Sequence, residues 1–130
     1  MIRSEFKELS KLSSKIGNNL DLIQGAGGNT SEKIGNSLWV KASGYWLSDA
    51  LKKNIFIPVK YKNILKNIDN KKSDPVSSEV VNYDEIKNLR PSIETTLHAV
   101  MPYKYVVHTH SINSIVNTIT KENLALLSEK

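Results

Sequence analysis

The stretch YVVHTH, residues 105–110, decides the fold: a short apolar run leads directly into a His-x-His triplet. Aromatic and β-branched residues in such a run are typical of a β-strand. In a strand, side chains two residues apart point to the same face of the sheet. His108 and His110 are therefore predicted to lie side by side at a strand end, which is a common arrangement for two ligands of a zinc-class ion. Two unrelated histidines at a strand end would produce the same pattern.

The remaining histidine, His98, has two interpretations. Catalytic zinc sites normally use three protein ligands and one open position, so two histidines are too few. His98 follows Glu94 by four residues, and both side chains share one face if this segment is helical. It is then either a third metal ligand or a structural histidine bonded to the backbone or to a carboxylate. We favour the structural role.

Glu94 is the strongest candidate for acid/base catalysis. It follows Arg90-Pro91-Ser92 in a segment where we predict a helix over residues 93–100, capped by Ser92. A carboxylate beside a bound cation can move a proton to or from a carbon next to a carbonyl, with a pKa set by burial and charge. The alternative is an acidic first-turn residue that only complements the helix dipole.

The rest of the chain alternates between helical and extended patterns. The Gly35-Asn36 dipeptide joins two apparent strands and predicts a hairpin. Strands so close together in sequence exclude a purely parallel sheet, so the fold class is α/β or α+β. At 130 residues the chain has the length of one compact domain. We predict helices over residues 4–16, 47–51, 62–67 and 112–119, the last capped by Ser111, and strands over 30–34, 38–42 and 55–59.

Two turns of small residues adjoin these strands, residues 27–30 (GGNT) and 42–44 (ASG). Backbone N–H groups exposed in such turns form anion-binding nests, which predicts a phosphate site. Neither turn has the spacing of a P-loop or of a dinucleotide-binding fingerprint. A Gly-Gly-Asn sequence also occurs often as an ordinary turn, so each turn alone is a weak signal.

Composition excludes several classes of protein. The chain has no cysteine, which rules out disulfides, thiolate metal sites and cysteine nucleophiles. Its net charge of +5 comes from scattered lysines with only two arginines, whereas nucleic-acid modules concentrate their cations on one stripe. No apolar run has the length of a membrane span, and the first residues do not resemble a signal peptide. We expect a cytoplasmic protein that binds neither nucleic acid nor membrane.

Four motifs, taken in order, resemble the class II aldolase/adducin family, most of all its rhamnulose-phosphate aldolase-like branch and the aldolase part of aldolase–dehydrogenase fusions. They are QGAGGNTS (24–31), LWVKASG (38–44), RPSIETTLH (90–98) and VVHTH (106–110). The resemblance implies a three-layer α/β/α sandwich with a mostly antiparallel sheet, in one domain over residues 1–130. It also implies a homotetramer with active sites between subunits.

The same resemblance implies roles for individual residues. His108 and His110 would bind Zn2+ or another divalent metal, Glu94 would be the catalytic acid/base, and His98 would not be a ligand. In the family's aldol chemistry the metal chelates a dihydroxyacetone-phosphate-like donor and acts as a Lewis acid, while the glutamate handles the proton on the reacting carbon. The substrate phosphate would lie among Gly28, Asn29, Ser43, Gly44 and Ser92.

The function implied is therefore a metal-dependent aldolase that cleaves a ketose 1-phosphate to dihydroxyacetone phosphate and an aldehyde. A sugar-phosphate 4-epimerase or a dehydratase would use similar residues on the same scaffold. A non-catalytic, adducin-like interaction module is a third alternative. The sequence does not distinguish the sugar.

Two features depart from the family pattern. Ser77-Ser78-Glu79 resembles a Ser-Ser-Glu motif of some relatives, but no histidine follows at helical spacing, so Glu94 is preferred. Family enzymes usually supply a third histidine ligand well after the His-x-His pair, and this sequence contains none there. The sequence would then be a fragment of a longer protein, a naturally shortened relative, or a chain completed by a partner. We expect a domain that is incomplete at its C-terminus and has little or no aldolase activity alone.

Overall fold

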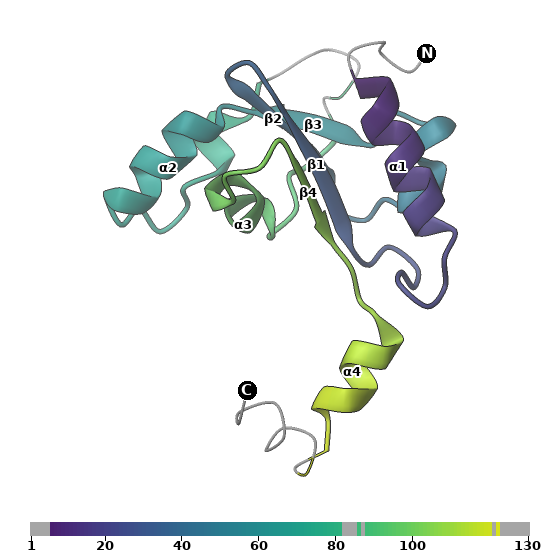
Figure 1. Cartoon of the computed structure of the whole chain (residues 1–130). Coiled ribbons are helices and arrows are strands. Elements are labelled where there is room, and N and C mark those ends of the chain that lie inside the picture. The colour runs from purple at the N-terminus through teal and green to yellow at the C-terminus, as the bar shows by residue number, and fades with distance from the viewer. Residues whose placement is uncertain (1–5, 82–85, 87, 121, 123–130) are drawn as a thin grey trace.

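The centre of the molecule is a four-stranded antiparallel sheet with the strand order β3-β2-β1-β4 (Figure 1). The computed structural model describes residues 6–81, 86, 88–120 and 122. The predicted mixture of helices with an antiparallel sheet is confirmed. The strands are β1 (Asn29–Ile34), β2 (Ser37–Lys41), β3 (Phe56–Val59) and β4 (Tyr105–His108).

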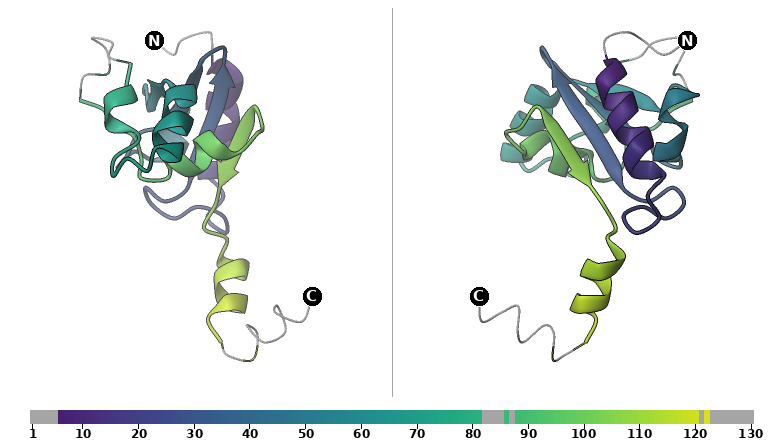
Figure 2. Two further views of the ribbon diagram at one scale, coloured as in Figure 1. Left: turned by 90° about the vertical axis from the view of Figure 1, so that its left-hand side faces the viewer. Right: turned by 45° about the vertical axis from the view of Figure 1, so that its right-hand side comes forward.

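Helices cover both faces of this sheet, which gives the predicted three layers (Figure 1). On one face lie α1 (Lys7–Gly17) and the 3-10 helix η2 (Leu47–Leu51); on the other lie α2 (Tyr61–Asp69) and α3 (Thr95–Val100). The 3-10 helix η3 (Ser77–Glu79) follows α2. The last helix, α4 (Ile112–Thr118), extends away from the sheet in both views of Figure 2.

The alternation of side chains along β2 explains why there are two hydrophobic cores. Trp39 points to the α1 face, where its ring centroid lies 4.9 Å from that of Phe6. Its neighbours Leu38 and Val40 point to the opposite face and pack in the core that includes Ile64 of α2. All are buried, so a shift of one residue in the register of β2 would exchange the two faces and is strongly disfavoured.

Strand β1 lies between the hairpin and β4, and this position brings together the residues of the candidate site. It forms the predicted hairpin with β2, and Gly35 in the turn has a φ of 59°. On its other side β1 pairs with β4, which comes much later in the sequence, so that Asn29 lies opposite His108. Residues from the beginning and the end of the domain therefore meet at one end of these two strands.

The predicted boundaries that fall on described residues hold within two residues, but the helix predicted over 93–100 begins at Thr95, with Glu94 and not the predicted Ser92 at the N-cap. The reason is a turn closed by Ser92, whose carbonyl oxygen accepts from both N and Oγ1 of Thr95. The predicted cap of the last helix by Ser111 is confirmed, since its Oγ accepts from the Ser114 N–H. Part of the helix predicted over residues 4–16 lies outside the described residues.

Within the described parts of the chain, every helix is too short or too polar to cross a lipid bilayer.

Candidate metal centre

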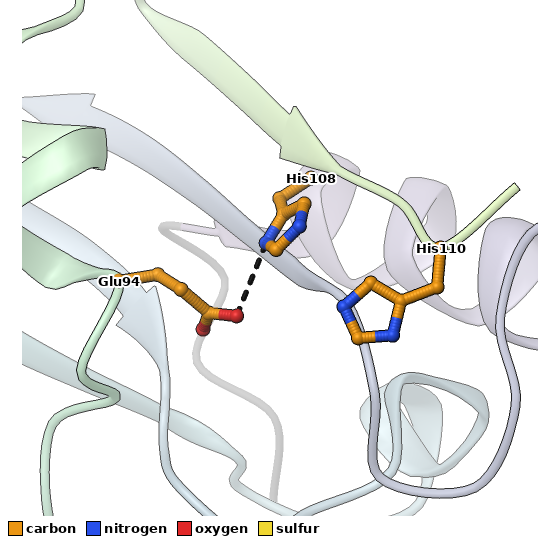
Figure 3. Close-up of side chains that lie close together, drawn as sticks. All are labelled: Glu94, His108 and His110. Carbon is orange, nitrogen blue, oxygen red and sulfur yellow. Dashed lines mark ion pairs between the residues drawn. The ribbon is translucent and has the colours of Figure 1, made fainter. Parts of the chain in front are cut away.

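Three side chains from two separate segments of the chain converge at the end of β4. Figure 3 shows the carboxylate of Glu94 and the rings of His108 and His110 turned toward one another. Each residue offers one ligand atom, and these atoms lie within 4.8 Å of one another. The two imidazole rings have their centroids 5.0 Å apart with an interplanar angle of 65°. Although β4 ends at His108, the two rings thus remain neighbours, as the His-x-His spacing suggests.

The backbone after β4 is held by the loop that precedes β1. His110 N donates to Leu22 O over 2.8 Å, and Ile112 N donates to Asp21 O over 2.9 Å. These bonds continue the contact between β1 and β4 after the sheet has ended. The position of the His110 ring therefore depends on a loop that lies far away in sequence.

Two glycines in this loop make room for the histidines. A Cβ on Gly27 would lie 2.8 Å from His110 Nδ1, which is closer than real contacts allow. Gly28 has a φ of 68°, and a Cβ there would lie 2.9 Å from His108 O and 2.1 Å from Ile23 Cδ1. The sequence predicts an anion nest at this turn, but the contacts show a further requirement for glycine that only the folded chain reveals.

Glu94 is held by a specific set of hydrogen-bond donors. Its Oε2 accepts from Asn29 Nδ2 over 3.1 Å and from the hydroxyl of Ser92. Burial alone raises the pKa of Glu94, but the hydrogen bonds from Ser92 and Asn29, with nearby positive charge, outweigh it and lower the pKa below its ordinary value. The carboxylate is therefore ionised at neutral pH, with one oxygen anchored and the other directed at the histidines.

The free oxygen of Glu94, Oε1, lies 3.1 Å from His108 Nδ1. The two atoms are not aligned as a hydrogen bond, and this buried nitrogen has no hydrogen-bond partner. A buried, unpaired ring nitrogen beside a carboxylate oxygen is a suitable start for a coordination site. Imidazole nitrogen and carboxylate oxygen together form the donor set of zinc-class ions, so these residues fit such an ion.

His98 lies outside this three-residue group, as the structural interpretation requires. It is fully buried, and its Nδ1 is 2.7 Å from Ser31 Oγ. The expected partner was the backbone or a carboxylate, and the observed one is a serine hydroxyl. Burial lowers the pKa of His98 to about 4, so the ring is neutral at physiological pH.

The residues predicted around a phosphate gather near Glu94. Asn29 and Ser92 both donate to its carboxylate, while the turn of Ser43 and Gly44 is tied to the segment before Ser92 by the bond from Ser43 N to Arg90 O, 2.9 Å long. The sheet-like bridge between Ala42 and Pro91 reinforces this contact. Ser43 and Gly44 are exposed, and Gly44 has a φ of 80°. Their assignment to a substrate phosphate stays a prediction.

Glu79, the alternative to Glu94, has a different role. Its carboxylate accepts from Asn63 Nδ2 over 2.8 Å and from Asn67 Nδ2 over 3.1 Å, both on α2. It therefore fastens η3 to a helix, and it is not part of the three-residue group.

Lys41 is the residue of this region that the sequence analysis missed. It is only 2% exposed, and its Nζ donates to Ala26 O over 3.0 Å and to Tyr45 O over 2.8 Å. The sequence offers one signal for it: Lys41 comes directly after an apolar strand and directly before the small residues of a turn.

Comparison with known proteins agrees with this architecture. The family described as "Class II Aldolase and Adducin N-terminal domain" matches residues 7–130. A Bacillus subtilis (strain 168) protein named "Uncharacterized oxidoreductase YuxG" is 34% identical over 137 residues, which cover 95% of this chain and 19% of YuxG. The chain thus spans about a fifth of that relative.

A solved structure is similar in both fold and sequence. It is the N-terminal class II aldolase domain of a conserved protein from Thermoplasma acidophilum, with a TM-score of 0.73 and 30% sequence identity. The similarity covers 93% of this chain and 62% of that domain structure. By sequence and by fold, the chain belongs to the class II aldolase and adducin family.

Proposed function

We propose that the chain carries the metal-binding and proton-transfer residues of a divalent-metal-dependent lyase. The substrate class would be a ketose 1-phosphate, cleaved to dihydroxyacetone phosphate and an aldehyde. The observation that supports this proposal is the convergence of Glu94, His108 and His110, whose ligand atoms lie within 4.8 Å of one another in a class II aldolase fold. Zn2+ is the proposed ion, because imidazole nitrogens such as those of His108 and His110 are among its usual ligands.

His108 and His110 would hold the ion, which when bound supplies a Lewis acid that polarises a substrate carbonyl. The ring of His110 is fixed through its backbone N–H and by the close approach of Gly27. The unpaired Nδ1 of His108 already faces the shared space. Both rings are therefore oriented by the fold before any ligand binds, which reduces the entropy lost on binding.

Glu94 would accept and return the proton on the reacting carbon. Hydrogen bonds from Asn29 and Ser92 fix one carboxylate oxygen, so the other keeps one direction toward the site. A general base must lie within hydrogen-bond reach of its proton, and this anchoring provides that geometry. Because the pKa of Glu94 is lowered, the group is in its basic form at neutral pH.

The substrate phosphate would bind at the turns beside Glu94. The exposed turn of Ser43 and Gly44 offers the Ser43 hydroxyl and the Gly44 N–H, while the Ser43 N–H bonds to Arg90 O; Gly28 and Asn29 lie in the second turn. The chain's net charge of +5 favours approach of a dianion.

Other activities on this scaffold remain as alternatives. A sugar-phosphate 4-epimerase or a dehydratase would use the same metal ligands and phosphate turns. An adducin-like interaction module needs no metal ligands, so the convergence of two histidines and a glutamate favours an enzyme. The oxidoreductase name of YuxG belongs to a protein of which this chain matches 19%, and we do not extend it to this domain.

The active unit would be a cytoplasmic homotetramer, with sites formed between subunits. We further propose that this polypeptide alone has little aldolase activity. Its site offers two histidines and one carboxylate, and if Glu94 must stay free for proton transfer, only two ligands hold the metal. Two imidazoles bind zinc more weakly than the three protein ligands of typical catalytic sites.

Zinc titration against a competing chromophoric chelator tests the proposal. His108→Ala and His110→Ala should each lower zinc affinity by about tenfold or more, because each removes a direct ligand. Glu79→Gln is the matched control and should leave zinc affinity unchanged. Equal zinc affinity in the wild type and both histidine variants would refute the metal centre, while robust aldol cleavage by the isolated chain would refute its predicted inactivity.

A further inference from the structure

Lys41 is a buried cation at a position where two turns meet. It is the last residue of β2, and its side chain is almost fully enclosed. Its ammonium donates to Ala26 O in the turn of residues 25–29 and to Tyr45 O in the turn of residues 43–46. Placing an ammonium group in the interior is unfavourable unless hydrogen bonds replace its water. These two carbonyl oxygens supply that replacement.

The sheet itself does not hold these two turns together. Pairing between β1 and β2 runs from Ile34 and Ser37 to Ser31 and Val40, and it stops there. Beyond that point Asn29 still pairs with β4 and Lys41 with β3, and a 3.5 Å hydrogen bond from Asn29 Nδ2 to Lys41 O links the two strands. The hydrogen bonds of the Lys41 ammonium therefore span the place where the backbone ladder between β1 and β2 has ended.

Each turn that Lys41 contacts carries part of the candidate site. The first leads through Gly27 and Gly28 to the histidines, and then to Asn29, which anchors Glu94. The second presents the exposed Ser43 and Gly44. A displacement of either turn would therefore change the distance between groups predicted to bind one phosphate.

A simple counter-ion role for Lys41 fits the contacts less well. Its hydrogen bonds go to carbonyl oxygens, and Glu94 acts on it through charge alone. Burial lowers the pKa of Lys41, while the charge of Glu94 raises it. The ammonium donates two hydrogen bonds to backbone carbonyl oxygens of the turns, so the backbone orients this group.

We propose that Lys41 is a positioning residue that fixes the spacing of the two glycine turns, and with it the width of the gap that receives the substrate's phosphate dianion. It acts through the turns and is not itself a ligand of the anion. The phosphate part of this inference rests on the proposed function, but the link between the turns does not.

Hydrogen exchange and phosphate binding test the two parts separately. Lys41→Met keeps the length of the side chain and removes its charge and donors. Amide exchange in residues 25–29 and 43–46 should accelerate about tenfold, and the affinity for inorganic phosphate should fall about tenfold, because two charge-assisted hydrogen bonds are lost. Zinc affinity should change by less than about threefold, since His108 stays paired with Asn29 and the backbone of His110 stays bonded to Leu22 O, which lies outside the two turns.

Lys33→Met is the matched control. Lys33 Nζ also donates to backbone carbonyl oxygens, those of His98, Met101 and Tyr103, but these lie at the end of α3. The control should accelerate exchange there and leave both glycine turns and phosphate affinity unchanged. It thus separates a specific link between the turns from a general effect of losing a lysine that donates to backbone carbonyl oxygens.

The outcomes are distinct. Unchanged exchange in both turns of Lys41→Met would overturn the proposal, and a loss of phosphate affinity with protected turns would identify Lys41 as a direct anion ligand instead. If the wild type binds no phosphate but Lys41→Met loosens both turns, the proposed substrate class fails while the positioning role is supported. Should Lys41→Met not fold, Lys41→Arg carries the test: wild-type phosphate affinity with accelerated exchange in both turns would overturn the proposal.

Discussion

Gly27 lies so close to His110 that a single methyl group between them would displace the ring: a Cβ at Gly27 would stand 2.8 Å from His110 Nδ1. This contact joins a turn near the start of the domain to the proposed metal ligand near its end. In the sequence Gly27 looks like an ordinary loop glycine, but in the structure it determines where the His110 ring can lie.

Gly27→Ala should therefore lower zinc affinity by about tenfold, because the displaced ring no longer faces its partner ligands. Chelator competition measures this, and a one-dimensional spectrum of the imidazole protons reports the ring's displacement. Gly25→Asn is the control, because nothing lies within 4 Å of its Cβ position and asparagine tolerates the φ of 57° found there. Unchanged zinc affinity in Gly27→Ala would contradict the role of this contact.

Glu94→Gln should abolish any proton transfer at the site and weaken zinc binding. The variant keeps the shape of the side chain but removes the charge that faces His108. Exchange of a substrate carbon proton with deuterated solvent, followed by NMR, measures the first effect. Glu79→Gln provides the comparison, since it should lose stability through weaker bonds from Asn63 and Asn67 and keep both zinc affinity and exchange. Retained exchange in Glu94→Gln would assign the base to another residue.

Ser92→Ala should raise the pKa of Glu94. The Ser92 hydroxyl donates to Oε2 and favours the ionised carboxylate. Without this bond, the effect of burial, which raises the pKa of Glu94, is less well balanced. A carbon-13 NMR titration of the Glu94 carboxyl resonance measures the change. Asn63→Ala should leave this titration unchanged, because Asn63 donates to Glu79. A Glu94 titration that is identical in the wild type and in Ser92→Ala would contradict the hydrogen bond.

The free energy of unfolding should fall as the pH decreases from about 6.5 to about 4 because of His98. Its folded pKa of about 4 lies below the ordinary 6.5, so in this window the unfolded chain binds a proton that the folded chain does not. The contribution of His98 is fully present above pH 6.5 and decreases by up to about 3 kcal/mol by pH 4. Glu94, whose pKa is lowered, loses its contribution only below its ordinary value of 4.5.

Urea unfolding between pH 4 and pH 7.5 measures this dependence. His98→Gln should be less stable than the wild type at pH 7.5 and should lose most of the slope between pH 4.5 and pH 6.5. A wild-type slope in that variant would place the titrating group elsewhere.

Sequence patterns that extend over only a few residues were sufficient to predict most of the helices and strands. The apolar run before His108 predicts a strand, and Gly35-Asn36 predicts a hairpin, because periodicity and turn chemistry act over short distances. The start of α3 was misplaced because Ser92 forms a local turn with Thr95 that competes with the first helical turn.

The candidate site likewise contains residues that the sequence predicts and residues that only the fold reveals. The histidine pair and Glu94 carry recognisable chemistry in their own motifs. The burial of Lys41 and the tight approach of Gly27 to His110 depend on partners that are distant in sequence. Such contacts have no periodic signature, so they become visible only when the chain is folded.

We expect the pairing of Asn29 with His108 also to influence the order in which the domain folds. The hairpin of β1 and β2 closes a two-residue turn and forms on a timescale of microseconds, whereas β4 joins only after the long intervening segment has been ordered and the entropy of that large loop has been lost. We therefore expect the histidine end of β4 to be acquired late in folding and released early in unfolding. The proposed metal centre would then be lost while most of the helices and the hairpin of β1 and β2 remain folded.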